Sequence, residues 1–230
     1  MIGVIGAMQI EIDGLKEKVE NSQTVTVSGI DFVTGTIHGT DVVLAVCGMG
    51  KVFAAVCAQT MILKFQVDAL ITTGVAGNLS EKLGIKSVAV ASSVVQHDMD
   101  LTPVGYAQGE LGGINLVNIP CDKKLVSIVE HCVKAMGVNY QVGTIATGDQ
   151  FINKLEQKRF ITGHFQAIAA EMEGGSIGQT CYINHVPFVI IRAISDDADG
   201  SAPEDFPAFA NEAAAISIEI VLDVLKEYGK

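Results

Sequence analysis

Carboxylates at the ends of apolar segments are the side chains of this sequence best placed to do chemistry. Glu171 and Glu173 follow the apolar segment 167–170. Asp196 comes shortly after the continuous apolar run 187–194. A run of this kind is typical of a buried strand in a parallel sheet. Because ligands bind outside the carboxyl ends of such strands, we expect Glu173 and Asp196 to line one pocket.

Glu11 is a third candidate acid. Residues 2–5 predict a short strand, and apolar residues at helical spacing between Met8 and Val19 predict a helix after it. Glu11 would lie on the inward edge of that helix. An acid near a helix N-terminus is also favoured by the helix dipole alone, and the residues by themselves favour this second interpretation.

Two glycine-rich turns follow predicted strands, at 47–51 and 74–77. The first ends in Gly-Met-Gly-Lys but is not a phosphate loop, because Ala45 replaces a required glycine and Val52 replaces the Ser or Thr. It is not a dinucleotide fingerprint either, since Phe53 stands at the third glycine. A close backbone approach to a small ligand and a plain turn both remain open.

Two other segments carry side chains that could bind a ligand. His97, Asp98 and Asp100 could hold a metal, but no second His or Cys cluster supports this, and we expect an ordered loop or a subunit contact. Phe151, after a predicted strand at 142–147, could stack on a flat ring or belong to the core.

The elements that must position these residues alternate between strands and helices. Hydrophobic residues make up 49% of the chain and charged residues 18%, which fits a large sheet covered on both faces. The pattern predicts a single domain over residues 1–230, an α/β fold of three layers (α/β/α) with a central mixed β-sheet. The further predicted strands are 24–27, 30–37, 42–46, 69–73 and 87–95, and the predicted helices begin near residues 47, 122 and 201. A capping box of Ser201 and Glu204 would open the last helix, with Pro207 breaking or restarting its first turns.

The net charge and the cysteines limit the kinds of partner and the cellular compartment that we expect. The net charge of −11 and the absence of a Lys/Arg cluster argue against nucleic acid and anionic membranes, so a small molecule is the expected partner. Five scattered cysteines without a C-x-x-C pair indicate reduced thiols of a cytoplasmic protein. The N-terminus has no signal-peptide character, and no apolar run reaches the roughly 20 residues of a membrane helix.

Several of these pieces together resemble one family. The chain is similar, from its first strand to its last helix, to the 5′-methylthioadenosine/S-adenosylhomocysteine nucleosidases of the nucleoside phosphorylase-like superfamily. The matching segments, in the family's order, are 6–11 (Gly-Ala-Met-Gln-Ile-Glu), 47–51, 73–77 (Thr-Gly-Val-Ala-Gly), 97–100 (His-Asp-Met-Asp), 148–153 (Gly-Asp-Gln-Phe-Ile-Asn), 171–173 and 192–196 (Arg-Ala-Ile-Ser-Asp).

The resemblance implies a phosphorylase/hydrolase-like fold and hydrolysis of the N-glycosidic bond of adenosine-type thioether nucleosides, as in methionine salvage and adenosylhomocysteine recycling. It implies that Asp196 protonates the leaving adenine and that Glu11 activates water. Glu173 would bind the ribose hydroxyls. No metal or other cofactor is required.

The resemblance also implies a set of binding residues and a homodimer. The expected substrate-binding residues are Met8, Met49, Ala76, Gly77, Phe151, Ile152, Met172, Glu173, Ser195 and Phe206. A loop from the neighbouring subunit would close the 5′ side of the pocket, with Leu101, Val104 and Tyr106 as its wall.

Two positions depart from the family pattern, and three other functions compete. Val75 stands where Ser is usual and Val104 where an aromatic ring is common. Phosphate-dependent purine nucleoside phosphorylases of this superfamily carry an Arg where this chain has Thr72 and a Ser where it has Val75, so both of their phosphate donors are missing here. An aminodeoxyfutalosine nucleosidase would use the same acids. A non-catalytic nucleoside-binding protein would be expected to have lost one of the three acids.

Overall fold

The computed structural model describes residues 1–229, which form one 11-stranded sheet flanked by helices. The strands are β1 (Ile2–Gly6), β2 (Glu20–Val27), β3 (Ile30–Ile37), β4 (Thr40–Val46), β5 (Ala69–Thr72), β6 (Val75–Asn78), β7 (Val88–Gln96), β8 (Ile119–Pro120), β9 (Tyr140–Thr147), β10 (Ala169–Glu171) and β11 (Phe188–Asp196). The helices are α1 (Asp13–Lys16), α2 (Lys51–Phe65), α3 (Lys123–Met136), α4 (Leu155–Phe165), α5 (Gly174–Ile183) and α6 (Ala202–Tyr228), with 3₁₀ turns η1 (Gln9–Glu11) and η2 (Thr102–Val104).

The sheet is mixed, and its centre is parallel. The strand order is β2-β3-β4-β1-β5-β11-β6-β10-β9-β7-β8, with a further pairing between β11 and β7. β1 pairs in parallel with β4 and β5, and β11 pairs in parallel with β5 and β6. Every residue of β5 and β11 is buried, as expected for apolar strands covered on both faces.

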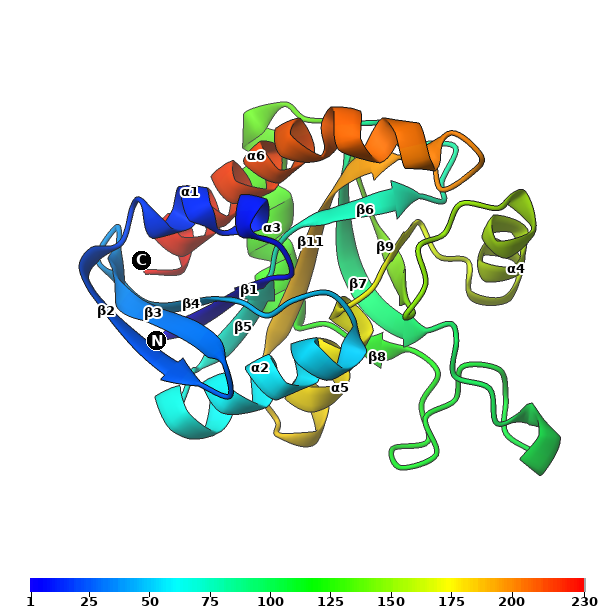
Figure 1. The fold of residues 1–230 in the computed structure, drawn as a ribbon, viewed down its shortest axis with the longest axis horizontal. Helices are drawn as coiled ribbons and strands as arrows, with labels where there is room; N and C mark the ends of the chain where they lie inside the picture. The colour runs from blue at the N-terminus through cyan, green and yellow to red at the C-terminus, as the bar shows by residue number, and fades with distance from the viewer. Residues whose placement is uncertain (230) are drawn as a thin grey trace.

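Helices cover both faces of the sheet, which confirms the predicted three layers. α2 and α5 lie on one face and α3 and α6 on the other (Figure 1). Met61 of α2 and Ile177 of α5 belong to one apolar cluster, whereas Val129 of α3 and Leu225 of α6 belong to the other. No helix of the described residues is both long enough and apolar enough to span a bilayer.

The predicted helix between Met8 and Val19 is wrong. The segment forms only η1 and the single turn α1, and β2 begins at Glu20. The carboxylate of Glu11 accepts hydrogen bonds from the backbone N–H groups of Ala7 and Met8, which ties the chain into a tight turn instead of a continuous helix.

The predicted turn at 74–77 is also wrong, because residues 75–78 form β6. Gly74, at φ +151°, lies between β5 and β6, and a Cβ there would collide with Glu11 and Arg192. β11 pairs with β5 through Phe188–Ile190 and with β6 through Ala193–Asp196. The carboxyl end of β11 therefore lies beside β6.

The start of the last helix differs from its prediction. Ser201 makes no side-chain cap, and its hydroxyl donates to the carboxylates of Asp199 and Asp205 instead. α6 continues through Pro207 without a break. Pro207 lies in the second turn, where the missing N–H removes only one backbone hydrogen bond.

Candidate active site

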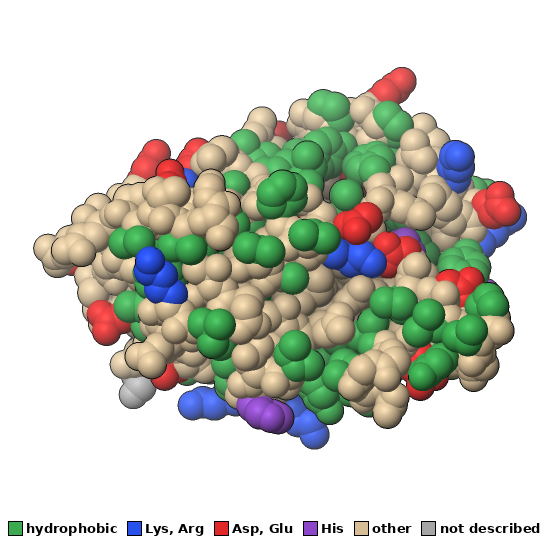
Figure 2. Space-filling view, turned by 60° about the horizontal axis from the view of Figure 1, so that its bottom comes forward, with side chains coloured by type: hydrophobic (Ala, Val, Ile, Leu, Met, Phe, Trp, Pro, Cys, Tyr) green, Lys and Arg blue, Asp and Glu red, His purple; other side chains and the backbone are tan. Residues whose placement is uncertain are grey.

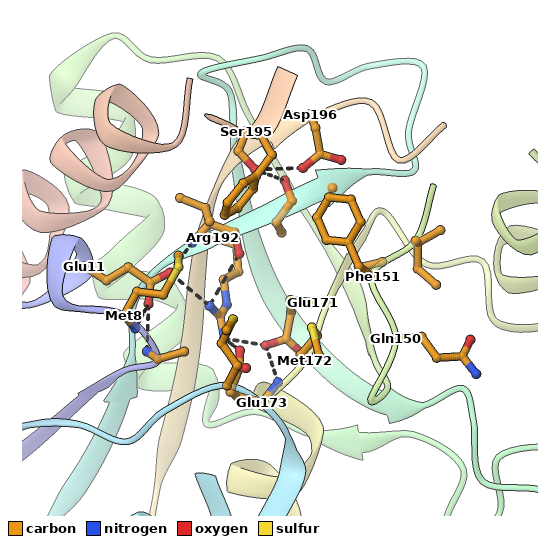
Figure 3. A pocket seen from close by; sticks show the side chains of 18 residues that line it. Met8, Glu11, Gln150, Phe151, Glu171, Met172, Glu173, Arg192, Ser195 and Asp196 are labelled. Atoms are coloured by element: carbon orange, nitrogen blue, oxygen red, sulfur yellow. Dashed lines mark hydrogen bonds and ion pairs between the residues drawn. The ribbon is translucent and has the colours of Figure 1, made fainter. Parts of the chain in front are cut away.

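One cavity opens at the carboxyl ends of β1, β10 and β11 and along β6, and it collects the catalytic and substrate-binding residues expected from the sequence. These are Met8, Glu11, Met49, Ala76, Gly77, Phe151, Ile152, Met172, Glu173, Ser195, Asp196 and Phe206. The cavity is also lined by Ala7, Val75, Gln150, Ala170, Glu171 and Arg192. Figure 3 shows Glu11 and Asp196 at separate ends of the cavity, with Arg192 between them.

The three predicted wall residues lie outside this cavity. Leu101, Val104 and Tyr106 belong to the segment that follows β7 and contains η2. Val104 is 70% exposed and Tyr106 38% exposed. Their proposed place in a neighbouring subunit's pocket requires a second copy of the chain.

Glu11 is held as a hydrogen-bond acceptor. Its Oε2 accepts from the N–H groups of Ala7 at 2.7 Å and Met8 at 2.9 Å, and its Oε1 accepts from Val75 N at 3.0 Å. The side chain is buried. Since an N–H can only donate, these contacts fit the ionised carboxylate and leave acceptor capacity on Oε1.

Arg192 is the main functional residue that sequence reasoning left without a role. Its Nη2 donates to Glu171 and, at 3.3 Å, to Glu173, and its Nη1 lies 3.9 Å from Glu11 Oε1. Burial lowers the pKa of Arg192, but these carboxylates outweigh burial and raise it. The signal was present, since a cation within the apolar strand 187–194 needs carboxylate partners.

Glu171 holds together several neighbouring parts of the site. Its carboxylate accepts from the Thr147 hydroxyl, from Arg192 and from the N–H groups of Glu173 and Gly174 at the start of α5. A carboxylate at a helix N-terminus is stabilised by the unpaired backbone N–H groups there. Glu171 therefore fixes Arg192 and the start of α5 relative to each other.

Glu173 points into the cavity, and each of its two carboxylate oxygens has one hydrogen-bond partner. Its Oε1 accepts from Gly50 N at 2.9 Å, and its Oε2 accepts from Arg192. Burial raises the pKa of Glu173 to about 7, with Glu171 adding to the shift and Arg192 opposing it. The carboxyl can therefore hold or release a proton near neutral pH.

Asp196 occupies the opposite end of the cavity. Its Oδ2 accepts from Ser195 Oγ at 2.9 Å and its Oδ1 from Ala198 N at 2.9 Å. Burial raises the pKa of Asp196 above its ordinary value, although both hydrogen bonds oppose the shift. A carboxyl in this environment is suited to donate a proton.

Aromatic and thioether side chains form the apolar part of the cavity. The rings of Phe151 and Phe206 meet edge to face, with centroids 5.8 Å apart. Met172 lies beneath the cavity between Glu173 and Phe151 (Figure 3). Met49 is 63% exposed and Phe151 44% exposed, so this side of the cavity is open in one copy of the chain.

The carboxylates of the acidic segment 97–100 accept hydrogen bonds from nearby protein groups. Asp98 Oδ1 accepts from Lys51 Nζ at 2.7 Å, and Asp100 Oδ1 accepts from the hydroxyl and N–H of Thr102. Among residues 1–229, no group of three His, Cys, Asp or Glu side chains has an arrangement that could hold a metal.

The class of protein follows from a family comparison, in which a sequence profile of the phosphorylase superfamily matches residues 1–226. A 5′-methylthioadenosine/S-adenosylhomocysteine nucleosidase of Staphylococcus carnosus is 40% identical over 98% of this chain and 99% of its own length. The nucleosidase of that name from Neisseria meningitidis, solved in complex with methylthio-immucillin-A, superposes with a TM-score of 0.96 at 36% identity and covers 98% of both chains. The chain belongs to the 5′-methylthioadenosine/S-adenosylhomocysteine nucleosidase family, which confirms the resemblance.

A futalosine hydrolase of Helicobacter pylori has a similar structure. It superposes with a TM-score of 0.94 at 32% identity, covering 98% of this chain and 97% of its own. The fold therefore does not separate these two substrate classes.

Proposed function

We propose that residues 1–230 act as one nucleosidase domain that hydrolyses the N-glycosidic bond of 5′-methylthioadenosine and S-adenosylhomocysteine. The observation that carries the proposal is the pair of acids at opposite ends of one cavity. Glu11 is held by backbone N–H donors, and Asp196 has a pKa raised by burial. Cleavage of a glycosidic bond with water needs a base on the side of the water and an acid at the leaving group.

Glu11 is the proposed base. Water would donate one proton to the Glu11 carboxylate while its oxygen bonds to C1′ of the ribose. Arg192 Nη1 lies 3.9 Å from Glu11 Oε1, so a cation faces the proposed base. General acid or base help of this kind is typically worth about 10² to 10⁴ in rate.

Asp196 is the proposed acid. As the bond between C1′ and N9 breaks, its electron pair passes to the adenine, and Asp196 gives a proton to N7 so that the base leaves neutral. Ser195 donates to the Asp196 carboxyl and orients it. Phe151 and the Ile152 backbone would hold the adenine, and Ala76, Gly77 and Phe206 line the same cavity.

Glu173 would accept hydrogen bonds from the ribose hydroxyls, with Met172 packed under the sugar. Positive charge develops on the ribose in the transition state, and a fixed carboxylate beside it lowers the barrier. Met8 and Met49 provide the apolar contacts expected for the 5′ thioether.

The phosphorylase alternative is disfavoured by the charges around the cavity. A phosphate nucleophile needs cationic or hydroxyl donors. Val75 contributes only an apolar side chain, and Thr72 is not among the lining residues. Arg192 is already paired with Glu171 and Glu173, so it offers no free positive charge.

The open side of the cavity supports a homodimer. Exposed apolar side chains lie on α2 (Val52, Phe53, Val56, Leu63) and α5 (Tyr182, Ile183). Figure 2 shows hydrophobic side chains spread over the face on which these helices lie. In a dimer, Leu101, Val104 and Tyr106 of the second copy would cover the exposed Met49. Five buried cysteines without a C-x-x-C pair fit the reducing environment of the cytoplasm, where we place the protein.

The test uses chromatography to measure the release of adenine from methylthioadenosine, S-adenosylhomocysteine and aminodeoxyfutalosine. We expect the highest kcat/KM for one of the two thioether nucleosides. A kcat/KM that is highest for aminodeoxyfutalosine would assign the futalosine alternative, and no release from any of them would reject the proposal.

A further inference from the structure

Two charged residues have no part in the chemistry above, namely Lys51 at the end of the glycine-rich turn and Asp98 in the acidic segment after β7. In the structure they meet a third segment, which follows β9. Lys51 Nζ donates to Asp98 Oδ1 at 2.7 Å. Lys51 N donates to Asp149 Oδ1 at 2.8 Å, and Asp149 N donates to Asp98 Oδ2 at 3.0 Å. The three residues thus form a closed ring of hydrogen bonds across three loops.

Two of the three segments are directly attached to the cavity. Gly50, next to Lys51, donates its N–H to Glu173 Oε1 at 2.9 Å. Gln150 and Phe151, next to Asp149, line the cavity. A Cβ on Gly50 would come within 3.0 Å of Asp149 Oδ1, so the two loops are in close contact.

The surroundings favour a charged and persistent ring. The side chains of Lys51 and Asp98 are only 19% and 16% exposed. Burial raises the pKa of Asp98, but the hydrogen bonds from Lys51 and Asp149 outweigh it and lower the pKa overall. Residues 148–154 have no helix or strand of their own, so these contacts replace the order that a regular element would give.

We propose that Lys51, Asp98 and Asp149 form a positioning cluster that holds the Gly50 N–H on Glu173 and the Phe151 loop over the cavity. None of the three touches the proposed reacting atoms. Their effect on catalysis rests on the proposed function, whereas their effect on loop order does not.

The test uses Lys51→Met and Asp98→Asn in the full chain, each compared with Lys134→Met. Lys134 pairs with Glu130 on the exposed surface of α3, so the control removes the same side chain from a solvated pair. Two quantities are measured, kcat/KM for methylthioadenosine and hydrogen exchange of the amides in residues 48–52 and 148–153. Misplacing a substrate-binding group by about 1 Å costs about 100-fold in rate, so we expect kcat/KM to fall about 10- to 100-fold in both variants.

We expect amide exchange in the two segments to become at least about 10-fold faster, because each variant removes a bond that closes the loops. Exchange in α3 should stay unchanged. The double variant should lose no more activity than the worse single variant, since both break one network. If Lys51→Met does not fold, Asp98→Asn tests the same bond.

Three results would overturn the cluster. Unchanged exchange in the two segments would show that the ring does not order the loops. Faster exchange with normal kcat/KM would reduce it to a structural feature without a positioning role. Lower kcat/KM with unchanged exchange would mean that Lys51 or Asp98 acts on the substrate directly. A wild-type chain that releases no adenine would reject the proposed function, while the exchange measurement would still test the cluster.

Discussion

Glu11 and Asp196 are both buried carboxyls, but their neighbours prepare them for opposite roles. Glu11 receives three backbone N–H hydrogen bonds and lies 3.9 Å from the Arg192 guanidinium. Asp196 has no cation among the groups that shift its pKa, and burial raises that pKa. One side chain is thereby suited to accept a proton and the other to donate one.

Replacing either acid should stop the reaction without unfolding the protein. Asp196→Asn and Glu11→Gln keep the shape of each side chain but remove its proton chemistry. We expect kcat to fall about 10² to 10⁴-fold in each. Asp223→Asn, which changes an exposed residue of α6, is the matched control and should retain near-normal rates. Near-normal rates in either of the first two variants would contradict the assignment.

The raised pKa of Glu173 predicts a pH-dependent stability. Between the ordinary value of 4.5 and about 7, the folded state binds more protons at this carboxyl than the unfolded state does. Protonation of Glu173 therefore stabilises the fold below pH 4.5, and this contribution is lost as the pH rises toward about 7. One group gives a slope of at most about 1.4 kcal/mol per pH unit.

Urea unfolding of the wild type and of Glu173→Gln across this range would measure the effect. As the pH rises, the free energy of unfolding of the wild type should fall relative to that of Glu173→Gln. Glu219→Gln, an exposed position on α6, should show no such trend. A Glu173→Gln difference that is constant with pH would mean that Glu173 has an ordinary pKa in the fold.

At the scale of elements, most strands were predictable from sequence because their apolar runs are long and buried. The runs at 69–73 and 187–194 became β5 and β11. The failures lie beside the site. The segment after β1 is folded around Glu11 by tertiary hydrogen bonds, and β6 exists because it pairs with β10 and β11, which lie far away in the sequence. Local sequence patterns do not indicate such long-range contacts.

Gly74 is the element-scale feature that is simplest to test. Its φ of +151° and its contact with Glu11 and Arg192 leave no room for a side chain. Gly74→Ala should destabilise the fold by about 1–3 kcal/mol in urea unfolding and lower kcat/KM by displacing Glu11. Gly84→Ala is the control, since a Cβ there meets nothing within 4 Å. Equal stability of the two variants would contradict the close packing described for Gly74.

At the scale of the whole molecule, the sequence predicted which residues share the cavity but not how they are held. The resemblance supplied Glu11, Glu173 and Asp196, and the fold brings them together. The network through Arg192 joins β11 to β10 and η1, and the Lys51 ring joins three loops. Partners so far apart in sequence can be named only from the folded chain.

Because one side of the cavity is open, we predict that the protein is a dimer. Its mass in sedimentation equilibrium should be twice the 24.2 kDa of one chain. Leu63 on α2 is 69% exposed, and Leu63→Asp should shift the protein toward the single-chain mass. The KM should rise in the same variant, because the wall from the partner would be lost. Leu155→Asp, which changes an exposed residue of α4, should remain a dimer. A wild type that sediments as a single chain with normal KM would contradict the shared pocket.

The most direct test of the central claim is the identity of the nucleophile. Methylthioadenosine would be turned over in oxygen-18-labelled water with inorganic phosphate present, and the sugar product analysed by mass spectrometry. We predict free methylthioribose that gains one labelled oxygen at C1, formed at the same rate without phosphate. Methylthioribose 1-phosphate, or release that depends on phosphate, would contradict it and assign the chain to the phosphorylases.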